Sequence, residues 1–491
     1  MSPILVFSII ALYFLTLMGI SYFTSRNSSD NSTFFTGNRQ SPWFLVAFGM
    51  VGATLSGVTF ISVPGEVGNT GWTYLQFVMG NMVGYAIIAL VLIPLFYRMN
   101  LISIYEYLRD RFGQNSYLSG ASFFLISQTI GASFRLFLAA LVLQLAFFDA
   151  VGVPFYGTVL VTILLIWLYT FRGGIKTIVY TDTLQTLFLL SAVVVSIYLI
   201  TSHLNLGIGD AIAVVSESDM SKIFEWSWRS DRNFFKTFIA GIFITIAMNG
   251  LDQNIMQKNL TCKNPRDAQK NIFWFSITFF ISTMLFLALG VLLYKFAVDQ
   301  GIAIPERTDE LYPMLAIEYL GTFAGIVFLL GIIAAAFSSA DSALTALTTS
   351  FCVDILNISK KQVEKQEKTR FRVHIMFSVL MLGVIVAFNE INDSSVVNAV
   401  FKVAGFTYGP LLGLFAFGLL SKTQVRDKFV PIACIAAPLL SVLLDYNSEA
   451  WFNGYKFGFE ILLVNAALTC LGLFLLKTGR DKSQPVPARE S

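Results

Sequence analysis

Long apolar runs dominate this chain, and they decide what it can fold into. A helix needs about 17–25 predominantly apolar residues to cross a bilayer, and thirteen stretches reach that length. Inside a lipid bilayer every backbone polar group must be satisfied internally, which a helix does by itself. The sequence therefore predicts an all-α polytopic membrane protein with thirteen spans. They lie near residues 3–23, 41–69, 72–97, 116–148, 153–171, 179–201, 233–257, 271–295, 322–351, 373–389, 395–420, 429–445 and 457–476.

Composition supports a membrane setting and argues against several other classes. Hydrophobic residues make up 55% of the chain and charged residues 13%, whereas soluble domains carry about 25% charged residues. The net charge of +3 gives no support to nucleic-acid binding. Four scattered cysteines form no CxxC pair, and the two histidines, His203 and His374, lie far apart in the sequence. No disulfide framework, zinc site or catalytic cluster is expected, so the chain is not predicted to be an enzyme.

Basic residues indicate how the chain is threaded through the membrane. Taken alternately, the loops that begin with residues 24–40 and end with the C-terminal tail hold 24 of the 33 Lys and Arg residues. The loops on the opposite side hold seven. Because cytoplasmic loops are enriched in Lys and Arg, this bias predicts a multi-pass protein of the plasma (inner) membrane. Its N-terminus is expected outside and its C-terminus in the cytoplasm.

Two basic residues, Arg135 and Lys402, fall inside predicted spans. Charges at membrane depth are costly and usually mark a transport pathway or a binding site. A structural ion pair between helices is the alternative, because Asp182, Asp252 and Asp341 lie in or at the ends of spans as candidate partners. Both interpretations stay open at this point.

The second predicted span has an unusual centre. Residues 48–60 are rich in glycine, serine and threonine within an otherwise apolar run. An unwound helix here would expose backbone carbonyls that can bind a sodium ion, and its half-helix ends can hold a solute. A small-residue face that packs against a neighbouring helix is an equally good interpretation of this segment alone.

The ninth predicted span adds hydroxyl and carboxyl groups. Ser338, Asp341 and Ser342 are spaced i, i+3 and i+4, so they share one face of a helix. Such oxygens on a buried face are ligands that a hard cation such as sodium prefers. Serines alone often bond back to their own helix, but a buried carboxylate left without a partner is costly. This segment therefore favours a cation site.

A third segment makes the pattern specific to one family. Residues 173–185 read Gly-Gly-Ile-Lys-Thr-Ile-Val-Tyr-Thr-Asp-Thr-Leu-Gln. Paired glycines followed at this spacing by Thr-Asp and Gln resemble the signature of the sodium:solute symporter family. The broken second span and the serine-rich ninth span match the same family in the same order. The resemblance covers roughly residues 1–476.

This resemblance implies a LeuT-like fold, in which two five-helix units are related by a pseudo-two-fold axis in the membrane plane. The first helix of each unit is expected to be broken, at residues 52–57 and at residues 247–252. One extra helix would precede the two units and two would follow them. The implied divisions are 1–40 for the extra N-terminal helix and loop, 41–201 for the first inverted repeat, 202–232 for an extracellular loop, 233–420 for the second inverted repeat, 421–476 for two extra C-terminal helices and 477–491 for a cytoplasmic tail.

The resemblance also implies cation sites. Family members hold their principal sodium ion with oxygens of the first and eighth core helices. The corresponding residues here are Gly52, Leu55, Ala335, Ser338 and Ser339. Sialic acid transporters of the family add a second sodium site, which corresponds here to Asp182, Ser338 and Ser342. Asp341 stands where those members have serine, so this second cation site could take sodium, a proton or a salt bridge.

Nine residues are expected to contact the solute. Thr54, Ser56 and Thr59 match hydroxyls that the sialic acid members use at the helix break. Arg135 lies in the third core helix, one turn after the arginine that those members use. The other polar candidates, for each of which an interhelical hydrogen bond is the alternative, are Gln76, Asn81, Asn249, Gln253 and Lys402.

Together these features predict a sodium-coupled symporter that imports a small polar solute by alternating access, with sodium as the co-transported ion. Arg135 and Lys402 favour a carboxylate-bearing solute, such as sialic acid or another organic acid. A neutral sugar, an amino acid or a vitamin is the alternative. An ion channel would need a continuous polar stripe, and the sequence offers only a central polar patch. The expected partners are the solute, sodium and the lipid bilayer, with no nucleic acid, and the chain is expected to work as a monomer.

Overall fold

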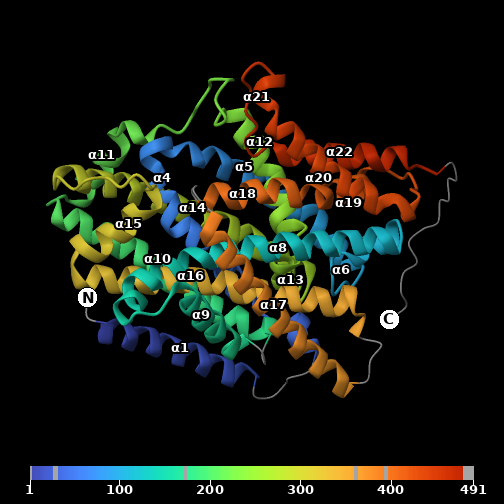
Figure 1. The fold of residues 1–491 in the computed structure, drawn as a ribbon, viewed down its shortest axis with the longest axis horizontal. Coiled ribbons are helices and arrows are strands. Elements are labelled where there is room, and N and C mark those ends of the chain that lie inside the picture. Colours follow the sequence, from blue (N-terminus) through green and yellow to red (C-terminus); the bar gives the residue numbers. More distant parts are fainter. Residues whose placement is uncertain (1–2, 26–30, 171–173, 359–362, 392–395, 479–491) are drawn as a thin grey trace.

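The computed structural model describes residues 3–25, 31–170, 174–358, 363–391 and 396–478, and within them the chain is helical with no extended strand (Figure 1). Two isolated bridges, Ser41 with Cys262 and Val425 with Lys477, are its only β contacts in those ranges. Gly173, the first glycine of the predicted signature, and residues 479–491 of the predicted tail lie outside the described residues.

The described residues form twenty-two α-helices. They are α1 (Pro3–Ser25), α2 (Asn31–Thr36), α3 (Trp43–Thr54), α4 (Gly57–Thr70), α5 (Tyr74–Ile87), α6 (Ile93–Arg98), α7 (Glu106–Arg111), α8 (Gln114–Leu143), α9 (Phe155–Thr170), α10 (Gly174–His203), α11 (Ile208–Glu217), α12 (Phe234–Thr245), α13 (Gln253–Asn259), α14 (Pro265–Asp299), α15 (Leu311–Met314), α16 (Gly321–Ser350), α17 (Val363–Ile391), α18 (Val396–Thr407), α19 (Gly409–Leu420), α20 (Val430–Tyr446), α21 (Ser448–Trp451) and α22 (Ile461–Leu475).

Many of these helices are long and apolar enough to cross a membrane. Within the described residues eight helical stretches meet that criterion, or up to ten if each of two bent pairs counts as one span. Three shorter apolar helices, α3, α9 and α22, coincide with further predicted spans. The chain is thus an all-helical, multi-pass membrane protein, as predicted, while the count of thirteen spans stays a prediction.

Both predicted helix breaks are present. The helix α3 ends at Thr54 and α4 begins at Gly57, because Ser56 has an extended ψ of 171° that no helix accommodates. The second break separates Phe234–Gly250, which ends in a π-helical turn, from α13, and the axis bends there by 71°. A third bend, of 44°, separates Ala399–Thr407 from α19, where the sequence predicts one continuous span at 395–420.

The helix α16 forms the centre of the molecule. Its side chains from Gly331 to Ser350 are all buried, and it packs against α10, α8, α3 and α4 (Figure 1). Many of these residues are Ala, Gly or Ser, whose small size lets neighbouring backbones approach closely inside a membrane. The buried core of the protein therefore runs along the segment that also carries the predicted cation ligands.

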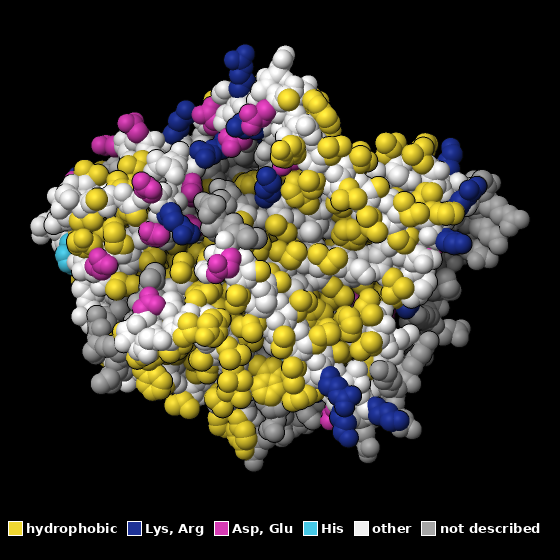
Figure 2. Space-filling model, in the orientation of Figure 1, with side chains coloured by type: hydrophobic (Ala, Val, Ile, Leu, Met, Phe, Trp, Pro, Cys, Tyr) yellow, Lys and Arg dark blue, Asp and Glu magenta, His cyan; other side chains and the backbone are white. Residues whose placement is uncertain are grey.

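The outer surface is apolar over a broad area (Figure 2). Large side chains stand exposed on several helices, among them Phe23 on α1, Leu90 near α5 and Leu439 on α20. Contiguous apolar surface of this size is unusual for a protein surrounded by water. It is the surface expected of helices that face lipid.

Candidate functional site

The unwound segment between α3 and α4 supplies free backbone oxygens at the centre of the protein. Both of its residues, Leu55 and Ser56, are buried. The last carbonyls of a helix lack intrahelical partners, and for α3 these include the carbonyl of Gly52. Gly57, the first residue of α4, directly faces Ala336 of α16, with 3.6 Å between a Cβ built on the glycine and the alanine Cβ. The break therefore lies against the serine-rich part of α16.

Close packing of α3 on α10 holds this segment in place. The Gly52 N–H donates to Thr186 Oγ1 at 3.0 Å, and a Cβ at Gly52 would overlap the Thr186 side chain. A Cβ at Gly49 would lie 2.9 Å from the Cβ of Asp182. Glycine is required at both positions because no side chain fits between the two helices. The predicted motif on α10 is thereby brought against the predicted break.

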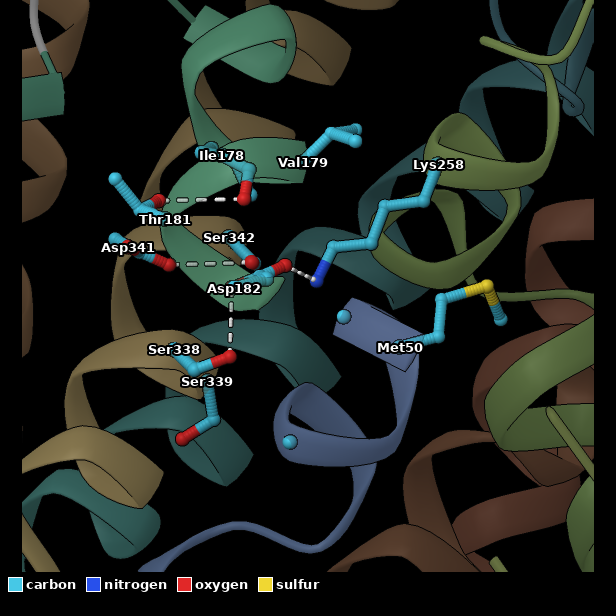
Figure 3. A network of polar contacts seen from close by, with 12 residues as sticks. Met50, Ile178, Val179, Thr181, Asp182, Lys258, Ser338, Ser339, Asp341 and Ser342 are labelled. Atoms are coloured by element: carbon cyan, nitrogen blue, oxygen red, sulfur yellow. Dashed lines mark hydrogen bonds and ion pairs between the residues drawn. The ribbon is translucent and has the colours of Figure 1, made fainter. Parts of the chain in front are cut away.

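A buried polar cluster joins α10 to α16 (Figure 3). Ser338 Oγ donates to Asp182 Oδ1 at 2.6 Å. On the far side of Asp182 from Lys258 in this view, Asp341 accepts hydrogen bonds from Tyr169 at 2.8 Å and from Ser342 at 3.1 Å. All four residues of the candidate second cation site, Asp182, Ser338, Asp341 and Ser342, are therefore close together and buried.

Lys258 completes the cluster, and sequence reasoning missed it. Its Nζ lies 2.6 Å from Asp182 Oδ2, and each side chain is only 1% exposed. The predicted seventh span ended at residue 257, so Lys258 was counted with the basic residues of a cytoplasmic loop. In the structure α13 continues to Asn259. The cluster therefore contains a buried salt bridge between Asp182 and Lys258, while the alternatives for Asp341 stay open.

A cavity of about 110 Å³ lies beside the two helix breaks. Six of the nine residues predicted to contact solute line it: Thr54, Ser56, Thr59, Asn81, Arg135 and Asn249. Three aromatic residues, Tyr74, Phe77 and Phe401, line both this cavity and a larger one of about 290 Å³. The smaller cavity is thus separated from the larger by aromatic side chains.

Arg135 shares the smaller cavity with an acid. Its Nε is buried and has no hydrogen-bond partner among the described residues, and Asp252 lines the same cavity. The Asp252 carboxylate accepts from the Asn254 N–H at 2.8 Å and from the Tyr408 hydroxyl. Tyr408 stands at the third bend, and sequence reasoning did not include it; the Gly409-Pro410 pair that follows it was the available signal. The cavity therefore offers both a cationic and an anionic group.

Three predicted solute contacts lie elsewhere. Gln76 donates to the Arg232 carbonyl at 3.1 Å and is bound to the loop before α12. Gln253 accepts from the Ile104 N–H at 3.0 Å and donates to the Ile102 carbonyl at 2.8 Å. Both glutamines thus hydrogen-bond to loop segments outside the cavity, whereas the predicted alternative was an interhelical hydrogen bond.

Lys402 lines the larger cavity instead of the smaller one. Its Nζ lies 3.2 Å from Asp445 Oδ2, and its side chain is 67% exposed. It is therefore a hydrated cation at the rim of the cavity system and not a buried charge.

Two broken helices that meet at a central cavity, next to buried oxygen ligands, define a secondary transporter. The chain belongs to the sodium:solute symporter family, because a model of that family matches residues 34–425. It is therefore a sodium-coupled symporter and not an enzyme, and sodium is its co-transported ion.

Several proteins of known activity are similar along most of the chain. The sodium/sialic acid symporter NanT of Aliivibrio fischeri is 27% identical over 440 residues, which is 88% of this chain and 84% of NanT. SiaT of Proteus mirabilis, also a sodium/sialic acid symporter, is 24% identical and covers 89% of this chain and 88% of its own. The human sodium/iodide cotransporter is 23% identical over 82% of this chain and 62% of its own.

Solved structures share the fold. A substrate-bound, outward-open Na⁺-coupled sialic acid symporter superposes with a TM-score of 0.82 at 19% identity, covering 96% of this chain and 97% of its own. The nucleobase-cation-symport-1 transporter Mhp1 in a closed conformation gives 0.53 at 13% identity, covering 92% and 94%. The LeuT-like architecture implied by the family resemblance is thereby supported at the level of the fold.

Proposed function

We propose that this symporter imports a carboxylate-bearing solute, such as sialic acid or another organic acid, by alternating access. The observation that supports this proposal is Arg135, whose side chain lines the central cavity and whose buried Nε has no partner in the part of the chain that the structure describes. A planar guanidinium matches a carboxylate with two parallel hydrogen bonds. Hydroxyls at the break, Thr54, Ser56 and Thr59, would hold the polar groups of the same solute. The names of NanT and SiaT agree with this substrate class.

Sodium is proposed to bind between the break and α16. The ligands would be carbonyls of Gly52, Leu55 and Ala335 and hydroxyls of Ser338 and Ser339. An ion held there would join the broken helix to the central helix and so stabilise the solute cavity beside it. Coupling is reciprocal: sodium must raise solute affinity by the same factor by which solute raises sodium affinity.

The remaining topology follows the same proposal. Thirteen spans would contain two inverted repeats, residues 41–201 and 233–420, joined by an extracellular loop at 202–232. Residues 1–40 and 421–476 would add one helix before and two after the repeats. The N-terminus would lie outside a plasma (inner) membrane and the tail, 477–491, in the cytoplasm, with the monomer as the working unit. The two helix breaks, between α3 and α4 and between α12 and α13, lie near the starts of the two proposed repeats and support this arrangement.

Asp252 favours a second candidate, a neutral polar solute such as a sugar, an amino acid or a vitamin. Because Asp252 lines the cavity together with Arg135, the arginine charge can be balanced inside the protein. A solute without net charge would then bind through hydrogen bonds alone.

Uptake into proteoliposomes under an inward sodium gradient separates these candidates. Sialic acid, a monocarboxylate, a neutral sugar and a neutral amino acid would be tested as radiolabelled solutes. For a carboxylate solute, Arg135→Lys should weaken affinity and Arg135→Ala should weaken it further, by about ten- to a hundredfold for a charge-assisted pair of about 1.5–3 kcal/mol.

Lys402→Ala provides the matched control, since it removes a cation at the cavity rim. Exposed ion pairs contribute only about 0–1 kcal/mol, so this variant should keep near-normal affinity. If Arg135→Ala lowers thermal stability but leaves solute affinity unchanged, Arg135 balances the charge of Asp252. The second candidate, a neutral solute, is then favoured.

A further inference from the structure

The ion pair between Lys258 and Asp182 is far more buried than seven other ion pairs among the described residues. In those seven pairs both side chains are at least 17% exposed, whereas here both are 1% exposed. Lys258 belongs to α13, the short arm after the second helix break, and Asp182 belongs to α10. A buried pair of this kind is costly to form, so its position at a candidate cation site calls for a functional reason.

We propose that the Lys258 ammonium takes the place of a second sodium ion, so that the symporter couples transport to one sodium ion per cycle. This inference rests on the proposed principal sodium site and defines the coupling stoichiometry of that site. Lys258 is then a specificity-determining residue: it decides how many ions the protein binds.

Both carboxylate oxygens of Asp182 already have partners. Its Oδ2 is bound to the ammonium at 2.6 Å and its Oδ1 to the Ser338 hydroxyl at 2.6 Å (Figure 3). A sodium ion at Asp182 would have to bind beside the ammonium, and repulsion between the two positive charges opposes this. Both cations are monovalent, but the ammonium is part of the chain and is always present at the site, whereas sodium must bind from solution.

Charge balance also favours one bound sodium ion per cycle. Asp182, Asp341 and Lys258 bring two carboxylates and one ammonium to this cluster, which leaves one net negative charge when all three are ionised. The principal site offers only neutral oxygens, from carbonyls and hydroxyls, so the ion held there needs a counter-charge nearby. An ionised Asp341, held by Tyr169 and Ser342, would supply this counter-charge for one sodium ion and leave none for a second.

The Lys258–Asp182 pair also joins α13 to α10. A sodium ion in its place would join these helices only while it was bound. Lys258 comes from α13 and binds Asp182 of α10, which in turn accepts a hydrogen bond from Ser338 of α16. This bridge persists whether or not sodium is present. The remaining sodium ion then acts at the first helix break alone.

Counting bound sodium tests this inference directly. Equilibrium binding of ²²Na⁺ to the purified wild-type protein should saturate at one ion per chain, and sodium should activate uptake with a Hill coefficient of one. Two ions per chain in the wild type would overturn the inference while leaving sodium-coupled transport intact. Absence of any saturable sodium binding would instead overturn the proposed function itself.

Three variants probe the lysine. Lys258→Gln should raise the count from one ion to two, because it leaves the carboxylates uncompensated. Lys258→Arg keeps the positive charge and should still bind one sodium ion per chain. The double variant Lys258→Gln with Asp182→Asn should also bind one. If Lys258→Gln folds, transports and still binds one ion, the lysine has a structural role only and the inference is wrong. If it does not fold, the wild-type count and Lys258→Arg decide.

Discussion

The hydroxyl of Ser338 is expected both to hydrogen-bond to Asp182 and to bind sodium. Its removal should therefore lower both the stability of the protein and its affinity for sodium. Ser338 Oγ donates to Asp182 Oδ1 at 2.6 Å inside the core. A hydrogen bond to a charged group contributes about 1.5–3 kcal/mol, so Ser338→Ala should lower the free energy of unfolding by about that amount. The same hydroxyl is one of the proposed sodium ligands. If an ion–hydroxyl contact contributes similarly, sodium affinity should fall by about ten- to a hundredfold.

Ser339→Ala separates these two effects. The Ser339 hydroxyl donates only to the Ala336 carbonyl of its own helix, at 3.1 Å, so no buried charge depends on it. This variant should weaken sodium binding with little change in stability. Ser441→Ala is the matched control, since Ser441 is equally buried and back-bonded, to Ala437 at 2.8 Å, but lies on α20 away from the site. It should change neither quantity.

Two measurements on the same purified variants decide the matter. Thermal unfolding without sodium reports stability, and sodium titration of uptake in proteoliposomes reports affinity. If both Ser338→Ala and Ser339→Ala keep the wild-type sodium dependence, the principal sodium site lies elsewhere. If Ser338→Ala unfolds at the wild-type temperature, the hydrogen bond to Asp182 contributes no stability and this reasoning about the cluster is refuted.

Two further predictions concern the helix break and the cavity. Gly52→Ala forces a methyl group into Thr186, so overpacking should lower the free energy of unfolding by about 1–3 kcal/mol and abolish most uptake. The control Gly383→Ala, with no atom within 4 Å of the new methyl group, should leave melting temperature and uptake unchanged. A Gly52→Ala variant with wild-type stability and uptake would contradict the close packing. Tyr408→Phe removes a hydroxyl donor from Asp252, so the carboxylate should compete with an anionic solute for the guanidinium and weaken its binding. Adding Asp252→Asn to Tyr408→Phe should restore the affinity for the solute. Equal solute affinity in the wild type, the single variant and the double variant would show that the carboxylate does not affect solute binding.

Hydropathy predicted the helices well because membrane insertion imposes one simple rule on every span. The two breaks were also predictable, since Gly, Ser and Asn residues interrupt otherwise apolar runs at 52–57 and 247–252. Residues 395–420 are apolar enough for one span despite Lys402, so the bend at Tyr408 was missed although the Gly409-Pro410 pair follows it. Local composition thus indicates where a helix can be broken but does not show every place where it bends.

Side-chain partners were harder to predict. Lys258 and Asp182 are 76 residues apart, and hydropathy placed the lysine in a loop, so nothing local linked them. Gln76 and Asn81 lie on the same predicted span, yet only Asn81 lines the cavity, because helix rotation decides which polar residue faces it. The family resemblance supplied what the local pattern lacked, by relating Asp182 and Ser338 before the fold was known.

The buried pair of Lys258 and Asp182 has a bioenergetic consequence for uptake of a monocarboxylate. One sodium ion and one monoanion carry no net charge inward, so the membrane potential would not drive their accumulation. A second sodium ion would add about 2.3 kcal/mol per 100 mV, or about fiftyfold in the attainable concentration ratio. By replacing that ion with a lysine, the protein would forgo this voltage-driven gain, and import would continue unchanged in a depolarised cell as long as the sodium concentration gradient remained.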